Sequence, residues 1–133
     1  MSEDLVLTLD HLVLTVADAE RSVAFYSHYL GMRPVTFGDN RRALLFGASK
    51  INLHEVGHEI APYAKRPTPG SADLCFLVSV PVARLRAKLV AAGLECTEPA
   101  PRTGARHPLL SFYLRDPDGN LIELANECPE PAP

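Results

Sequence analysis

The chain has 133 residues, enough for one compact domain whose own apolar core can stabilise it without disulfides or a structural metal. Its composition, 47% hydrophobic and 22% charged, is that of an ordinary globular protein, and its net charge of −3 argues against a nucleic-acid-binding protein or a reader of acidic membranes. No apolar run approaches the ~20 residues of a membrane span, and the acidic residues near the N-terminus are unlike the basic start of a signal peptide.

The first half of the chain predicts a strand, a helix and two further strands. Residues 9–16 are mostly leucine and β-branched, which is typical of a strand. Asp18 is a suitable N-cap for a helix that Gly31 would end in a left-handed conformation. Strands are predicted at residues 42–46 and 50–56.

The second half predicts the same order of elements. A strand is expected at residues 72–78, followed by a helix that starts at Pro81 and ends at Gly93. Two strands follow, at residues 111–115 and 121–126, joined by a turn rich in Asp, Pro, Gly and Asn.

These two halves form an internal repeat. His11 and Asp73 are 62 residues apart, whereas Asn52 and Glu123 are 71 apart, so the second half contains extra residues. We place them in a proline-rich loop around residues 99–108. We therefore predict a single α+β domain over residues 1–133, with module one at about 7–58 and module two at about 71–127. Residues 62–69 link the modules, and residues 128–133 are expected to be a disordered tail.

Polar residues interrupt several of the predicted strands. Asp73 and Glu123 each stand between apolar neighbours, and His11 shares its strand face with Leu9 and Val13. Asn52 and His54 share one face of their strand, since faces alternate along a strand. A charge on a buried face costs several kcal/mol unless it is paired or bound to metal. Oxygen and nitrogen donors of this kind suit a divalent metal ion, provided that they converge in space.

Three segments carry a family resemblance: the first strand, the end of the first helix and the last turn and strand. They read Asp10-His11-Leu12-Val13-Leu14-Thr15-Val16, then Phe25-Tyr26 with Leu30-Gly31-Met32, then Arg115-Asp116-Pro117-Asp118-Gly119-Asn120-Leu121-Ile122-Glu123-Leu124. Together they resemble the vicinal-oxygen-chelate superfamily, which includes glyoxalases, bleomycin-resistance proteins and extradiol dioxygenases. Lys50-Ile51-Asn52-Leu53-His54, Pro69-Gly70-Ser71-Ala72-Asp73-Leu74 and Pro101-Arg102-Thr103-Gly104 look like its small single-domain glyoxalase-domain proteins.

The resemblance covers residues 7 to 126. It implies two βαβββ modules that form a cupped mixed sheet around a metal or ligand cavity, and a homodimer. It also implies a protein that acts on a small molecule. The odd number and wide spacing of Cys75, Cys96 and Cys128 match neither a disulfide framework nor a zinc ribbon, so we expect a protein of the reduced cytoplasm.

Carried over by position, the resemblance assigns a set of metal ligands. His11 matches the first-strand histidine and Glu123 the last-strand glutamate, while Asp73 stands where the superfamily usually has histidine. Asn52 stands where glyoxalases often have glutamate, and His54 lies two residues further on. We expect a divalent ion (Ni, Co, Mn, Fe or Zn) held by His11, Asp73 and Glu123, with the fourth position open between His54 and Asn52.

Other residues are candidates for the substrate site. Arg102 lies in the inserted loop, where Arg106 and His107 are also found, and Tyr113 and Asn52 lie on strands that face the expected cavity. A solvated basic loop is the alternative explanation for the arginines. Cys75 is expected to be a small buried apolar residue rather than a nucleophile.

One sequence motif of a zinc protease does not predict a protease here. Residues 54–58 match the His-Glu-x-x-His pattern of zinc proteases, which needs both histidines on one helix face. Here the match begins on a predicted strand and contains Gly57, so a protease is not expected.

The sequence therefore predicts a small metal-dependent enzyme, a glyoxalase-like lyase or isomerase acting on an α-oxo or vicinal-oxygen compound, with Glu123 as general base. The main alternative is a metal-free binding protein like the bleomycin-resistance proteins, in which His11 and Glu123 would pair with each other. A dioxygenase-related protein and fosfomycin-type thiol transfer are further alternatives; the latter would need more cationic groups than Arg102, Arg106 and Lys50 provide.

Overall fold

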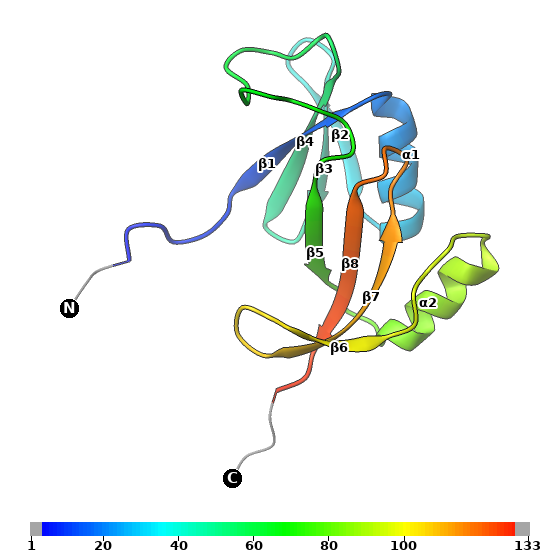
Figure 1. Cartoon of the computed structure of the whole chain (residues 1–133). Helices are drawn as coiled ribbons and strands as arrows, with labels where there is room; N and C mark the ends of the chain where they lie inside the picture. Colours follow the sequence, from blue (N-terminus) through cyan, green and yellow to red (C-terminus); the bar gives the residue numbers. More distant parts are fainter. Residues whose placement is uncertain (1–3, 130–133) are drawn as a thin grey trace. The chain divides into compact units, whose positions relative to one another are not determined.

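The computed structural model describes residues 4–129. The chain divides into two compact units, one up to Pro69 and the other from Gly70, and each contains one strand, one helix and three strands (Figure 1). This is the α+β arrangement of βαβββ modules that the sequence and the family resemblance predicted. The elements are β1 (His11–Val16), α1 (Ala19–Leu30), β2 (Arg33–Phe37), β3 (Arg41–Phe46) and β4 (Ser49–Glu55), then β5 (Asp73–Leu77), α2 (Val82–Ala91), β6 (Ala100–Thr103), β7 (Pro108–Arg115) and β8 (Leu121–Glu127).

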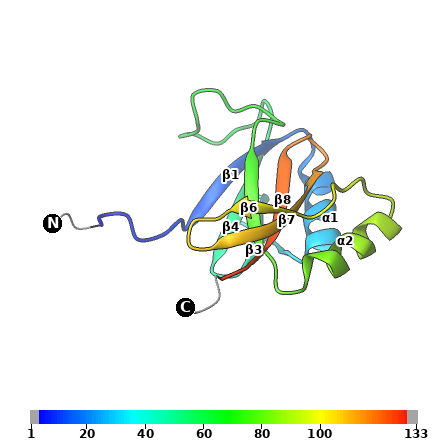
Figure 2. The same cartoon turned by 60° about the horizontal axis from the view of Figure 1, so that its bottom comes forward.

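Each unit forms its own four-stranded mixed sheet. The strand order is β1-β4-β3-β2 in the first sheet and β5-β8-β7-β6 in the second. β1 and β4 run parallel, as do β5 and β8, and the remaining pairs are antiparallel. The crossover helix α1 lies against β2, β3 and β4, and α2 lies against β7 and β8 (Figure 2).

The edge strands β2 and β6 were not predicted from the sequence. β2 and β6 contain Pro34 and Pro101, which lower strand propensity but are tolerated on an edge, where an amide hydrogen is not required. The loop predicted around residues 99–108 is therefore wrong for about half of its length: residues 100–103 form β6, which pairs with the start of β7, with Thr103 opposite Pro108. The predicted tail, residues 128–133, falls mostly outside the described residues.

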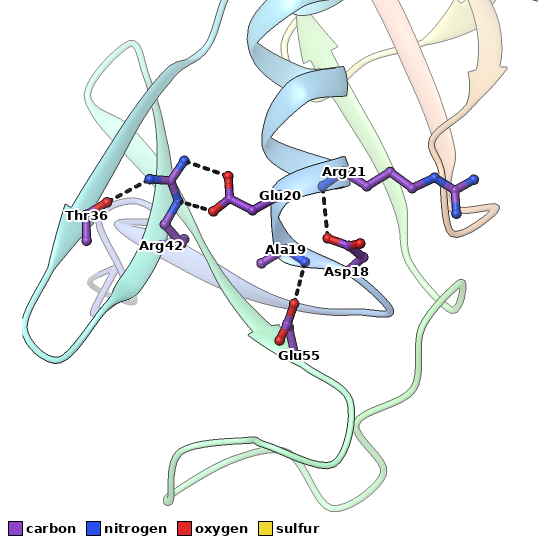
Figure 3. Close-up of polar contacts among 7 residues, drawn as sticks. All are labelled: Asp18, Ala19, Glu20, Arg21, Thr36, Arg42 and Glu55. Carbon is purple, nitrogen blue, oxygen red and sulfur yellow. Dashed lines mark hydrogen bonds and ion pairs between the residues drawn. The ribbon is translucent and has the colours of Figure 1, made fainter.

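Local hydrogen bonds fix both ends of α1. The Asp18 carboxylate accepts from the Arg21 amide at 3.1 Å, and Glu55 Oε2 on β4 accepts from the Ala19 amide at 2.9 Å (Figure 3). Gly31 ends the helix with φ 71°, in the left-handed region that favours glycine. The Asp18 and Gly31 caps are those predicted from sequence.

An arginine ties α1 to the sheet beneath it. Arg42 on β3 pairs with Glu20, with 3.2 Å between Nε and Oε1, and donates to Thr36 Oγ1 at 2.7 Å (Figure 3). The apolar residues on the same sheet face form the first core: Leu14, Val16, Leu44, Ile51 and Leu53 are all buried, together with Tyr26 of α1. The opposite face of the sheet is therefore the one free to present polar residues.

The second unit is anchored at both ends of β8. Asn126 at its C-terminal end accepts from the Val82 amide at 2.8 Å and donates to the Val80 and Val78 carbonyls, so it replaces the side-chain cap that Pro81 lacks. Before β8, Asn120 Oδ1 accepts from the Ala72 amide at 2.8 Å. Within residues 4–129 neither helix has the length and apolar character needed to cross a membrane.

Candidate functional site

The sheet face opposite α1 carries most of the candidates of the first unit. Strand register sets His11 beside Lys50, Val13 beside Asn52 and Thr15 beside His54. Since register partners on adjacent strands point to the same side, these residues form one surface. The predicted shared face of Asn52 and His54 is thus present.

His11 is oriented by its neighbour. Its Nδ1 lies 2.9 Å from Asp10 Oδ2, and the side chain is 43% exposed. A carboxylate on one ring nitrogen fixes the imidazole and leaves the other nitrogen, Nε2, to act as a ligand. This second contact is a common companion of metal-binding histidines and fits the predicted role.

His54 is buried without a hydrogen bond. Only 6% of its surface is exposed, and neither ring nitrogen has a hydrogen-bond partner among the described residues. Asn52, 7% exposed, has an unpartnered Oδ1 as well. The backbone amides of Gly57 and of Glu59 itself lower the pKa of the Glu59 carboxyl, and the charge of His54 lowers it further. Buried polar groups are nearly always satisfied, so such a pair indicates a missing partner.

A cavity of about 410 Å³ adjoins His54. Its walls come from β1 and from the segment after β4: Val13, Thr15, His54, Pro62, Tyr63, Ala64 and Pro67. The volume is within the range of small-molecule sites, and the lining is mainly apolar with a few polar groups, as in most such sites. The proline segment, predicted only as a linker, is thus a wall of this cavity.

The register separates the two histidines along the sheet. His11 and His54 stand four residues apart in the strand direction, because His54 pairs with Thr15. At about 3.3 Å per residue this amounts to roughly 13 Å, whereas Asn52 is only two residues from His11. Asn52 therefore lies closer to His11 along the sheet than His54 does.

In the second unit, two acidic residues flank a cysteine on the face opposite α2. Cys75 pairs with Glu123, and Asp73 lies two residues before Cys75 on the same side of β5. Cys75 is exposed, so the prediction of a buried cysteine is wrong. Desolvation of the thiol is the largest cause that raises the Cys75 pKa to about 11, and the charge and hydrogen bond of Glu123, then the charge of Asp73, add to it. Both carboxylates therefore favour the protonated thiol.

Tyr113 and Arg102 lie beside this acidic pair. Tyr113 on β7 is the cross-strand partner of Glu123, and Arg102 Nε donates to the Tyr113 hydroxyl at 3.1 Å. Arg106, in contrast, forms an ion pair with Glu127 at 2.7 Å. Of the arginines predicted in the inserted loop, Arg102 therefore faces the candidate site and Arg106 is engaged elsewhere.

The donor types of the predicted ligand set suit a divalent ion. Within residues 4–129, no three His, Cys, Asp or Glu side chains cluster closely enough to form a metal site. The chemistry nevertheless fits: His11 is oriented by Asp10, and Asp73 and Glu123 supply two carboxylates beside Cys75. A shared site for these ligands stays a prediction.

The zinc-protease pattern has no helix to support it. His54 and Glu55 belong to β4, and Gly57 follows in a turn with φ 83°. Glu55 instead caps α1 through the Ala19 amide. The pattern is a coincidence of sequence, as predicted.

Comparison with known proteins now decides the family. Residues 8–124 match the model of the Glyoxalase/Bleomycin resistance protein/Dioxygenase superfamily. The chain belongs to this superfamily. It is 52% identical over 118 residues to virulence protein STM3117 of Salmonella typhimurium, covering 88% of this chain and 82% of that protein. It is 49% identical over 122 residues to the glyoxalase domain-containing protein RDO1 of Mycosarcoma maydis, covering 91% and 69%.

Solved structures of superfamily members have the same fold. The crystal structure of STM3117 has a TM-score of 0.91 at 49% identity and covers 94% of this chain and 100% of that one. More distant structures share the fold alone: a lactoylglutathione lyase from Agrobacterium tumefaciens has a TM-score of 0.72 at 19% identity. The fosfomycin resistance protein FosX from Listeria monocytogenes, complexed with Mn(II) and sulfate, has a TM-score of 0.65 at 21% identity.

Proposed function

We propose that this superfamily member is a metal-dependent, glyoxalase-like lyase or isomerase that acts on a small α-oxo or vicinal-oxygen compound. The observation that carries the proposal is His54, buried and unpartnered in the wall of a 410 Å³ cavity, with the unpartnered Asn52 Oδ1 two residues earlier on the same face of β4. A folded protein tolerates such a cost, about 1–3 kcal/mol for each unsatisfied group, where a ligand supplies the missing partner.

In this proposal His11, Asp73 and Glu123 hold the ion. A divalent ion bound there would stabilise an oxyanion on the substrate as a Lewis acid. Glu123 is the general base, and its carboxylate already accepts a hydrogen bond from the Cys75 thiol. Asn52 faces the same side as His11, and His54 at the cavity offers one ring nitrogen to donate to, or accept from, the substrate.

We further propose that Arg102 and Tyr113 bind the substrate near Glu123, and that the protein works as a cytoplasmic homodimer. The hydrogen bond between Arg102 and Tyr113 supports the first statement, since it positions both groups beside Glu123. The dimer rests on the resemblance to the superfamily. Light scattering after size-exclusion chromatography measures the oligomeric state directly.

The decisive experiment is the metal content of untagged protein, measured for the wild type and for Glu123→Ala and His11→Ala. About one Ni, Co, Mn, Fe or Zn ion per chain in the wild type, lost in both variants, is the expected result. Lys88→Ala on α2 is the matched control and should keep the metal. Metal-free wild type that shows no thermal shift with any of these ions would overturn the proposal.

The same cavity favours one alternative, a metal-free protein that binds a small molecule. Most of its lining is apolar, supplied by Val13, Pro62, Tyr63, Ala64 and Pro67. A fluorescence-based ligand screen of metal-free protein, with His54→Leu as the comparison, separates the alternatives: retained binding in the absence of any ion would support sequestration.

A further inference from the structure

The face opposite α1 has a second feature, a cluster of cations around an aromatic ring on β2. The ring of Phe37 on β2 is contacted by two cations: Arg41 Cζ lies 4.8 Å and Lys50 Nζ 4.7 Å from its centroid. Both cations come from neighbouring strands, Arg41 from β3 and Lys50 from β4. The sequence did not indicate this cluster, because the three residues meet only through the register of three strands.

A small residue lets the lysine reach the ring. Ala43 lies on β3 between Asn52 on one side and Val35 on the other, on the direct path from Lys50 to Phe37. Its side chain ends at Cβ, so it leaves room for the long lysine side chain to cross β3 toward the ring.

The two cations have no anionic partner among residues 4–129. Three other arginines do have one: Arg42 pairs with Glu20, Arg86 with Glu98 and Arg106 with Glu127. In the described part of the chain, the residues that form ion pairs with carboxylates are these three arginines and His11. No carboxylate of residues 4–129 therefore lies within ion-pair distance of Arg41 or Lys50.

A third cation and a hollow adjoin the lysine. Arg33 and Lys50 line a hollow of about 290 Å³ together with Asp10. The Asp10 carboxylate is already engaged by His11 at 2.9 Å and is not within ion-pair distance of Lys50. The hollow is therefore lined by two unpaired cations and one engaged carboxylate.

The charged groups of Arg41 and Lys50 both lie within 5 Å of the centre of the Phe37 ring, so they are at most roughly 10 Å apart. This distance is close to the Debye length at physiological ionic strength, so salt screens their repulsion only in part. They repel each other through a medium that the ring and sheet make less polar than bulk water. An anion seated between them would remove this repulsion and add two charge-assisted hydrogen bonds.

We infer that Arg41, Lys50 and Phe37 form a binding site for the anionic group, carboxylate or phosphate, of a small molecule. The arginine supplies a planar fork and the lysine a compact charge, while the ring offers apolar surface to the carbon next to the anion. The site needs no metal and stands on the first unit alone.

The site also specifies a substrate class, and this step rests on the proposed function. Lys50 is the register partner of His11, and Asn52 follows two residues later on the same face. A molecule whose anionic end lies between Lys50 and Arg41 would extend its other end along the row that holds Asn52. The substrate is thus an acidic vicinal-oxygen compound rather than a neutral one.

The test is a titration of the full chain with inorganic phosphate and, separately, with acetate, followed by amide chemical shifts in two-dimensional NMR. The variants are Lys50→Gln, Arg41→Gln and the double substitution, with Lys88→Gln on α2 as the matched control. We expect wild-type binding in the millimolar range and a Kd about tenfold higher in each single variant, with the control unchanged. The stronger of the two anions identifies the group.

Glu123→Ala separates this inference from the proposed function. The variant should lose metal yet bind the anion with the wild-type Kd, because Glu123 belongs to the second unit and the cluster to the first. An unchanged Kd in the double variant, or no shift at Lys50 and Arg41 in the wild type, would overturn the anion site whatever the metal content. Tight binding of a heparin fragment through the same residues would also overturn it, in favour of a surface for polyanions.

Discussion

Asn52 and Glu123 occupy equivalent positions in the two modules. In each module, the residue lies opposite the third residue of the first strand. Asn52 is the register partner of Val13 on β1, and Glu123 is the register partner of Cys75 on β5. The repeat therefore carries a neutral amide in one module and a carboxylate in the other. The difference lies in burial too, since Asn52 is only 7% exposed whereas Glu123 is partly exposed.

Replacing this amide tests what its site tolerates. Asn52→Asp places a charge at a buried position whose oxygen already lacks a partner, so we expect a loss of about 2–4 kcal/mol in the free energy of unfolding at pH 7. Burial would raise the pKa of the new carboxyl, so the loss should shrink as the pH falls and the group becomes neutral. Urea unfolding at pH 7 and pH 5 measures both effects. Asn52→Leu, which removes the unsatisfied oxygen, should stay within about 1 kcal/mol of the wild type at both pH values.

His54 should separate stability from function. The variant His54→Leu removes two unpartnered buried nitrogens, so the free energy of unfolding should stay the same or rise by about 1 kcal/mol, while ligand binding at the adjoining cavity is lost. Leu53→Ala on the same strand, facing α1 and 6% exposed, is the contrast: it should cost about 2–5 kcal/mol. Urea midpoints compare the two. A marked destabilisation by His54→Leu would mean that the imidazole has a structural partner.

The thiol of Cys75 reports on its acidic neighbours. The variant Glu123→Gln removes one negative charge from beside the thiol, so the pKa of Cys75 should fall from about 11 while staying above the ordinary thiol value, because desolvation remains. Asp73→Asn should lower it less. The rate of alkylation by iodoacetamide against pH, in a Cys96→Ser and Cys128→Ser background, measures the pKa. Identical profiles in all variants would show that the carboxylates lie further away.

Asn126 should be the most important single polar side chain of the second unit. It makes three hydrogen bonds that tie the start of α2 to β8, so Asn126→Ala should lower the free energy of unfolding by about 2–3 kcal/mol. Glu98→Gln, which breaks the exposed ion pair with Arg86, is the control and should cost less than about 1 kcal/mol. Thermal unfolding followed by circular dichroism distinguishes the two.

Much of this architecture follows from local signals in the chain. Asp18 and Gly31 mark the ends of α1, and alternation on β1 and β4 identifies the face shared by Asn52 and His54. These features depend on neighbours a few residues apart. Sequence reasoning placed them correctly because no distant partner is needed to define them.

The rest depends on register, which periodicity does not reveal. The separation of His11 from His54 along the sheet, and the meeting of Phe37, Arg41 and Lys50, arise only when strands far apart in sequence align. Cys75 was expected to be buried because it lies on an apolar strand, but its face of β5 is exposed. Alternation in a single sequence shows which residues of a strand share a face. It does not show which of the two faces a helix covers.

The turn that joins β7 to β8 acts as a spacer between two carboxylates. Asp116 Oδ1 accepts from the amides of Asp118 and Asn120, and Asn120 in turn holds the Ala72 amide, one residue before Asp73. The Leu121 amide donates back to the Ala72 carbonyl at 3.0 Å. Asp73 is therefore the register partner of Leu121, and Glu123 lies two residues further along β8. The Asp-Pro-Asp-Gly-Asn turn thus sets the register of the two strands that carry the acidic groups.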